Sequence, residues 1–173
     1  MSYAAPIADI RFALECAADL WSLRERCPEL DEDLLVAILD SAAQLSGEAL
    51  APLNRSGDEA GVSLSGDQVR TAPGFREAYQ AFRSAGWLSL AADPAYGGQG
   101  LPSALALAVF ETVHGANMSF GLLPMLSQGA IEALERKGGG ALEGKSVGKG
   151  RSVDCGGRRI IKKKKASPSS GAI

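Results

Sequence analysis

Residues 91–102 read Ala-Ala-Asp-Pro-Ala-Tyr-Gly-Gly-Gln-Gly-Leu-Pro, and this stretch decides how the helices on either side of it are joined. Three glycines within the four positions 97–100 let the backbone adopt positive φ angles and let another group approach closely. Asp93-Pro94 begins a turn, because proline pushes the preceding residue out of the helical region. Pro102 suits a helix start, where its missing N–H is not needed. The stretch is therefore a tight loop, either a plain helix–helix connector or a loop that faces a ligand.

Three helices are predicted before this loop. Asp9 caps a first helix that runs through Trp21, and Pro28 stops the next turn. Asp31 caps a second helix, which ends near Pro52, and its apolar residues recur at three- and four-residue steps: Leu34, Leu35, Ile38, Leu39, Ala42, Leu45 and Ala49. A third helix opens at residues 71–73, ends at Gly86 and carries an aromatic stripe, which we expect to be core: Phe75, Tyr79 and Phe82.

Two further helices are predicted after the loop. Residues 103–112 form one, with Leu105, Ala108, Val109 and Thr112 facing inward, and a break follows at residues 115–117. Residues 123–134 form the last, with Leu126, Ala130, Ile131 and Leu134 on its apolar side. Short links between helices predict an all-α fold, an antiparallel helical bundle. One insertion interrupts it: the polar, Gly-rich residues 54–71, in which short segments flank Gly66-Asp67 and predict a small exposed hairpin.

The charge of the chain changes abruptly along its length. Residues 1–135 hold seven arginines, no lysine and 18 acids, a net charge of −11, whereas residues 136–173 hold eleven basic residues and two acids, a net charge of +9. We therefore predict two parts, a helical domain over 1–135 and a basic Gly/Lys/Ser-rich tail over 136–173. The tail lacks apolar periodicity and is expected to be disordered.

Other classes of protein receive little support from the sequence. No apolar run reaches the ~18 residues of a membrane span, and no secretory signal opens the chain. The three cysteines, Cys16, Cys27 and Cys155, lie far apart and indicate reduced thiols in the cytoplasm. The single histidine, His114, has no Cys or carboxylate partner nearby in sequence, so we expect a structural role and no metal site.

Residues 1–135 resemble the N-terminal helical domain of the acyl-CoA dehydrogenases, in particular a bacterial subgroup of that family. The stretches that carry the resemblance are residues 3–12, 50–58, 71–79, the loop 91–102 and 116–122. The resemblance implies an FAD enzyme, in which a Glu carboxylate removes the α-proton of an acyl-CoA thioester and the β-hydrogen leaves as hydride to the flavin. It also implies an electron-accepting flavoprotein partner and a homo-oligomer in full-length relatives.

In that family the N-terminal domain forms one wall of the flavin and acyl pocket. Carried over residue by residue, the resemblance implies that five residues line the acyl chain, although several of them could instead only pack the last helix: Ser119, Phe120, Leu123, Pro124 and Ser127. The family's β-domain, which supplies most flavin contacts, and its last domain, which holds the catalytic Glu, have no counterpart in these 173 residues. Glu111 and Glu132 are expected on solvated helix faces, so no catalytic and no specific flavin-binding residue is assigned.

The tail contains two further patterns. Residues 139–146 match G-x-x-x-x-G-K-S, but a phosphate loop needs a strand before it and a helix after it, and neither is predicted here. A basic patch at Arg158-Arg159 and 162–165 has no interleaved aromatic residue, so specific nucleic-acid binding is not expected. We hypothesise that the tail is an out-of-frame or artificial extension. The sequence thus predicts a truncated dehydrogenase domain, inactive alone; the alternative is a non-catalytic helical fragment that acts through self-association or partner binding.

Overall fold

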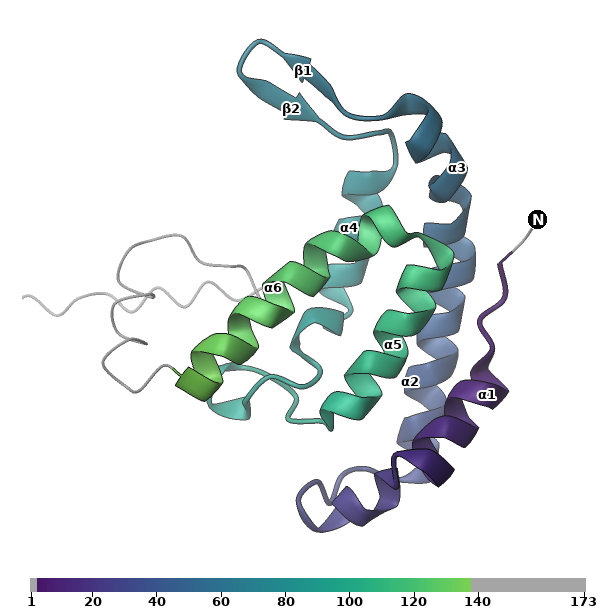
Figure 1. Cartoon of the computed structure of the whole chain (residues 1–173), viewed down its shortest axis with the longest axis vertical. Helices are drawn as coiled ribbons and strands as arrows, with labels where there is room; N and C mark the ends of the chain where they lie inside the picture. Colours follow the sequence, from purple (N-terminus) through teal and green to yellow (C-terminus); the bar gives the residue numbers. More distant parts are fainter. Residues whose placement is uncertain (1–2, 138–173) are drawn as a thin grey trace, which may run out of the picture.

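The computed structural model describes residues 3–137, and these residues form an all-α fold with one small hairpin, as predicted (Figure 1). The longest helical segment runs along one side of the fold. Helix α5 (Ser103–Ala116) lies beside this segment, and α6 (Met118–Lys137) runs from the upper end of α5 away from it, so that the two form an inverted V, with α4 (Phe75–Ser84) behind α6 (Figure 1). The predictions for residues 138–173, namely the disordered tail, the phosphate-loop match and the basic patch, lie outside the described residues.

The N-terminal segment differs from the single helix that the sequence predicts. Helix α1 spans Ile7–Phe12, continues as one π-helical turn over Ala13–Ala17, and is followed by a 3₁₀ segment at Leu20–Glu25. The break lies at Asp19, the one described non-glycine residue with a positive φ, 46°. The prediction of Asp9 as the cap is also wrong, because the helix begins two residues earlier, directly after Pro6.

Helix α2 (Glu32–Gln44) begins as predicted. The side chain of its N-cap, Asp31, accepts a hydrogen bond of 2.7 Å from the Leu34 amide, and Glu32 and Asp33 complement the helix dipole. An ion pair from Arg11 to Glu32 ties α1 to this first turn. The stripe of Leu35, Leu39 and Ala42 is fully buried and forms the centre of the core.

The predicted end of this helix near Pro52 is wrong. The chain passes through a π-helical turn at Leu45–Leu50 into α3 (Ala51–Ala60). Pro52 is tolerated because it lies in the first turn of α3. In a first turn, where the π-helical hydrogen bonding changes to α-helical, the backbone N–H that proline lacks is not needed for a helical hydrogen bond. The continuous helix 32–60 is long and apolar enough to cross a membrane by length and composition, although the core helix of a soluble protein passes the same test.

A two-stranded antiparallel hairpin follows, as predicted. Strands β1 (Ser63–Ser65) and β2 (Gln68–Arg70) pair with Leu64 opposite Val69. The turn is Gly66-Asp67, and only its first residue has a positive φ, 65°, which is typical of a type II′ hairpin turn. Figure 1 shows that the hairpin projects away from the helices at one end of the fold.

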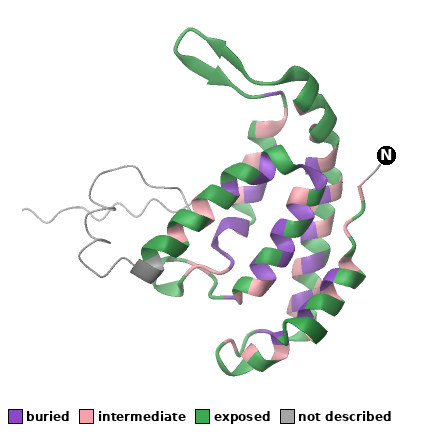
Figure 2. Cartoon of the chain, viewed as in Figure 1, coloured by how far each residue is buried: buried purple, intermediate pink, exposed green. Residues whose placement is uncertain are grey.

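Helix α4 (Phe75–Ser84) ends before Gly86, whose φ is 80°. Short 3₁₀ turns follow at Trp87–Ser89 and Pro94–Tyr96, and the second lies within residues 91–102, which we call the glycine loop and which lead to α5 (Ser103–Ala116). The four residues of α5 that we expected to face inward are all buried. Figure 2 shows the buried residues concentrated where α2, α5 and the segment after α4 meet.

The last helix, α6 (Met118–Lys137), begins five residues before the predicted residue 123. It includes Pro124 within its length, and the buried Asn117 immediately precedes it. The helix continues past residue 135, where the charge pattern predicts the end of the domain. Most of α6 is exposed along its length (Figure 2).

Candidate functional site

Helix α6 carries more exposed large apolar side chains than any other described element. Four of these side chains are between 43% and 67% exposed, and we call them the open face of α6: Leu122, Leu123, Met125 and Leu126. Contiguous apolar surface of this kind marks a ligand-binding or protein-binding region. The open face is therefore the first candidate for a functional surface.

Asn117 fixes the beginning of α6 to the rest of the fold. Its side chain has no solvent exposure, and its Oδ1 accepts hydrogen bonds from the Phe120 amide (3.1 Å) and the Ser119 hydroxyl (2.8 Å). Its Nδ2 donates to the Leu50 carbonyl at 3.2 Å, at the end of the π-helical turn. Asn117 is thus both the N-cap of α6 and a direct link between α6 and the long helix.

The inner side of α6 is held by aromatic packing. The Phe120 ring lies edge-on to Phe82, with centroids 5.6 Å apart, and contacts Phe75 and Tyr79 at 6.4 and 6.5 Å. The aromatic stripe of α4 is therefore core, as predicted. Because Asn117 and Phe120 hold one side of α6 rigidly, the opposite side is presented in a defined orientation.

The five residues implied to line an acyl pocket divide between these two sides. Ser119 and Leu123 are exposed, and Ser127 is half-buried, with its hydroxyl donating to the Leu123 carbonyl. Phe120 and Pro124 are buried and pack inward. The pocket-lining role of all five remains a prediction, and Leu123 has the most exposed large side chain among them.

His114 packs between α5 and α6. Its ring lies 5.9 Å from that of Phe110, and its Nε2 is the one buried side-chain polar atom of the described residues without a hydrogen-bond partner. A Cβ added to Gly121 would lie 2.2 Å from the His114 ring, so only glycine allows α6 to approach α5 this closely. The histidine sets the spacing of the two helices at the start of α6.

The glycine loop is rigid. The Asp93 side chain caps its 3₁₀ turn at 2.7 Å, and the amides of Gln99 and Leu101 donate to Ser89 and Leu90 at 2.8 and 2.9 Å. A Cβ on Gly98 would lie 1.9 Å from the Ala92 carbonyl oxygen. Close backbone approach accounts for Gly98, whereas Gly97 and Gly100 adopt positive φ angles of 90° and 67°.

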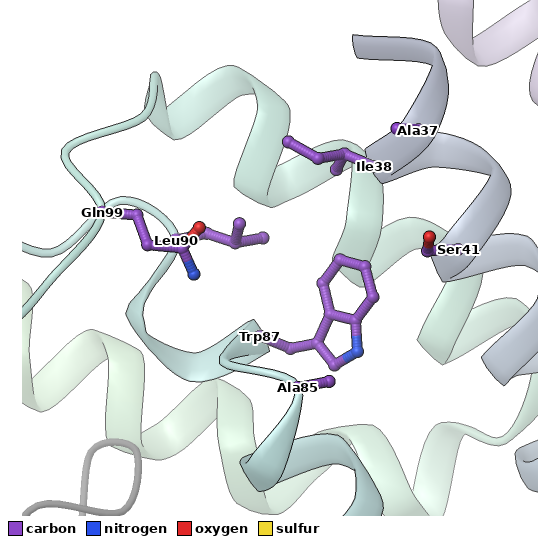
Figure 3. Close-up of a pocket in the computed structure, with 7 residues that line it drawn as sticks. All are labelled: Ala37, Ile38, Ser41, Ala85, Trp87, Leu90 and Gln99. Atoms are coloured by element: carbon purple, nitrogen blue, oxygen red, sulfur yellow. The ribbon is translucent and has the colours of Figure 1, made fainter. Parts of the chain in front are cut away.

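Two open concavities flank this loop. The first, about 290 Å³, lies between α2 and the segment after α4, with Ile38, Trp87 and Leu90 around it and Gln99 at one side (Figure 3). The second, about 400 Å³, is lined by six residues: Glu29, Leu34, Pro94, Gly98, Gln99 and Leu101. Gln99 lines both, while its Nε2 donates to the Gly86 carbonyl at 3.1 Å.

Neither concavity fits FAD, the cofactor that the resemblance implies. Sites for drug-sized ligands enclose roughly 300–1,000 Å³, and FAD is larger than such ligands. No lysine or arginine lines either concavity to meet the diphosphate, and Glu29 on the second would repel it. We therefore assign no flavin-dependent step to the described residues.

The charged groups of the described chain lie at the surface. The buried polar residues are Ser46, Ser89, Thr112 and Asn117, and no described carboxylate is among them. Burial, and to a lesser extent the Glu111 carboxylate, raise the pKa of Tyr3 above its ordinary value. The described residues likewise contain no group of three metal-ligating side chains.

Sequence reasoning missed Asn117 and His114 as organising residues of the site. We expected Asn117 only as part of a helix break and His114 only as a structural residue. An Asn three residues before Phe120 was the available signal for a cap, because Asn is among the preferred N-cap residues.

Comparison with known proteins shows the family of the chain. Residues 35–145 match the family model described as acyl-CoA dehydrogenase, N-terminal domain. The chain is also 39% identical over 144 residues to 3-methylmercaptopropionyl-CoA dehydrogenase of Ruegeria pomeroyi. That match covers 82% of this chain and 24% of the relative, so the chain spans about a quarter of the length of the curated relative.

Proposed function

The chain belongs to the acyl-CoA dehydrogenase family, and on that premise we propose that residues 3–137 form one wall of the acyl pocket of an FAD-dependent dehydrogenase. The observation that supports this proposal is the open face of α6, where four apolar side chains are between 43% and 67% exposed. The opposite side of the helix is fixed by the contacts of Asn117 and Phe120. An acyl chain needs an apolar surface, and a rigid wall positions it without further ordering cost.

The proposed role of this wall is to bind, orient and exclude water. Removal of an α-proton from a thioester requires a carboxylate that burial makes more basic. No described Asp or Glu is buried, and we propose that other polypeptide supplies the base. Closing the open face against that polypeptide would dehydrate the acyl chain and the reacting carbons. We propose that these residues alone do not catalyse dehydrogenation.

The cofactor and the partners of the complete enzyme are part of the same proposal. FAD would be held by polypeptide outside residues 3–137, because the two concavities flanking the glycine loop do not fit it. An acyl-CoA is the proposed substrate, an electron-accepting flavoprotein the proposed partner, and a homo-oligomer the proposed assembly.

A chimera tests the proposal. Residues 3–137 would replace the matching region of the Ruegeria enzyme, and turnover of 3-methylmercaptopropionyl-CoA would be followed with an artificial electron acceptor. We expect an active chimera in which Leu123→Asp raises KM, because a carboxylate would then face the acyl chain. Leu107→Asp is the matched control, since Leu107 is 71% exposed on α5.

Two results of the chimera experiment would contradict the proposal. A chimera that folds and retains flavin but shows no turnover would count against the proposed wall, and so would equal effects of the Leu123 and Leu107 substitutions.

The second candidate function, a non-catalytic fragment that acts through self-association or partner binding, is favoured by the other exposed apolar side chains, Phe12 among them at 67%. This second function predicts that neither Leu123→Asp nor Leu107→Asp changes the KM of the chimera.

A further inference from the structure

The hairpin arm, residues 58–71, is a second uncovered surface, separate from the open face of α6. All fourteen of these consecutive residues are exposed. The arm leaves the end of α3 and projects beyond the helices (Figure 1), and Figure 2 shows it exposed throughout. No described residue covers this arm, so its surface is open to a partner.

The hairpin has one apolar face and one polar face. Leu64 and Val69 are cross-strand partners, and Val62 lies two residues before Leu64, so the three side chains point to the same side. They are 72%, 69% and 70% exposed. The opposite face carries Ser63, Ser65, Gln68 and Arg70. Two strands alone are marginally stable in water, and three or more with a hydrophobic face are needed for stability.

The two edges of the hairpin are not equivalent. Soluble proteins protect an exposed strand edge with charged residues or proline. Strand β2 carries Arg70 and follows Asp67, whereas β1 is Ser-Leu-Ser, without charge or proline. The unprotected β1 edge is therefore the edge open to pairing. Over residues 62–71 the hairpin has one Asp and one Arg, so its net charge of zero does not oppose self-association.

We propose that β1 pairs antiparallel with β1 of a second copy of this chain, about a two-fold axis at Leu64. A strand paired with its own copy antiparallel satisfies two-fold symmetry, because each residue then meets its symmetry-related partner. The result is a four-stranded sheet, with six apolar side chains on one face. The pairing does not depend on the acyl-pocket proposal, since it uses no residue of α6.

The surface of the hairpin arm is small for a protein–protein interface. A standard interface buries about 800 Å² per partner from about 20–30 residues. Fourteen arm residues fall short of this, so we expect a weak dimer that is populated only as the protein concentration rises. Sedimentation velocity across a concentration series should show a monomer that becomes a dimer.

Two variants and a matched control test the pairing. Leu64→Lys places two like charges at the axis and should abolish the dimer, whereas Leu107→Lys, equally exposed on α5, should leave it intact. Circular dichroism checks that each variant is folded. In a background where Cys16, Cys27 and Cys155 are serine, Leu64→Cys should form a disulfide-linked dimer, because directly opposite residues of an antiparallel pair have Cα atoms about 4.5–5.5 Å apart, a separation that a disulfide can span. Leu107→Cys should not.

A chain that stays monomeric at every concentration overturns the proposal and indicates that another segment covers the arm, for example in a longer polypeptide. A dimer unaffected by Leu64→Lys, or no disulfide from Leu64→Cys, also overturns it. Loss of the dimer in the Leu64 variant alone, together with the Leu64→Cys cross-link, supports it.

Discussion

Replacing Asn117 by alanine is the most informative single change to the folded chain. Asn117 has no solvent exposure and makes three hydrogen bonds, to the Leu50 carbonyl and from the Ser119 hydroxyl and the Phe120 amide. Alanine removes all three and leaves the apolar packing around α4 unchanged. The substitution therefore tests whether polar contacts, as well as packing, hold α6 in place.

The magnitude follows from two of these contacts. Loss of an Asn N-cap costs about 1 kcal/mol, and a buried carbonyl without a donor costs about 1–3 kcal/mol. We expect Asn117→Ala to lower the free energy of unfolding by about 2–4 kcal/mol. With a urea m-value of about 1.5 kcal/mol/M, the midpoint would fall by roughly 1–3 M.

Urea unfolding, followed by circular dichroism and by tryptophan fluorescence, measures this change. Ser119→Ala removes only one partner of Asn117 and should cost no more than about 1 kcal/mol. Asn117→Ser keeps a good cap but cannot reach Leu50, so it should fall between alanine and the original residue. An alanine variant as stable as Ser119→Ala would refute the reasoning.

Three further predictions concern packing and charge. Gly121→Ala should destabilise the chain by about 1–3 kcal/mol in urea unfolding, because its Cβ would lie 2.2 Å from the His114 ring; His114→Ala should relieve that cost in a double-mutant cycle, and Gly129→Ala, with open space around it, should not destabilise. Gly98→Ala should cost at least about 3 kcal/mol, since its Cβ would meet backbone 1.9 Å away and backbone cannot rotate aside; an equal cost for Gly121→Ala would contradict this ranking. The Tyr3 phenol should titrate above its ordinary pKa of about 10. Because the pKa is raised in the folded state, its contribution to stability is present below about pH 10 and is lost as the pH rises through the folded value. Ultraviolet difference spectra against Tyr3→Phe would show this, and a Tyr3 midpoint at or below 10 would count against it.

Local chemistry made the fold class and several boundaries predictable from the sequence. Asp31 with its following acids specifies the start of α2, and Gly66-Asp67 specifies the hairpin turn, because both depend on contacts within a few residues. The inward residues of α5 follow from helical periodicity alone. The family resemblance rested on short motifs of the same kind, and the family match confirmed it.

The remaining features depend on an irregular helical turn or on contacts distant in sequence. Pro52 indicated a helix end, yet a π-helical turn just before it lets the helix continue. Asn117 caps α6 through the nearby Phe120 amide, but its hydrogen bond to the Leu50 carbonyl, 67 residues away, could not be predicted from the sequence. The inward packing of Phe120 depends on three rings of α4, so a sequence pattern could not show that Phe120 is buried while Leu123 is exposed.

The central proposal is that these helices form one wall of an acyl pocket and that the FAD site lies on other polypeptide. The most direct measurement is the visible flavin absorption of the purified chain after incubation with excess FAD and dialysis. The account predicts a colourless protein with a helical circular dichroism spectrum. A yellow protein that retains one FAD per chain would contradict it.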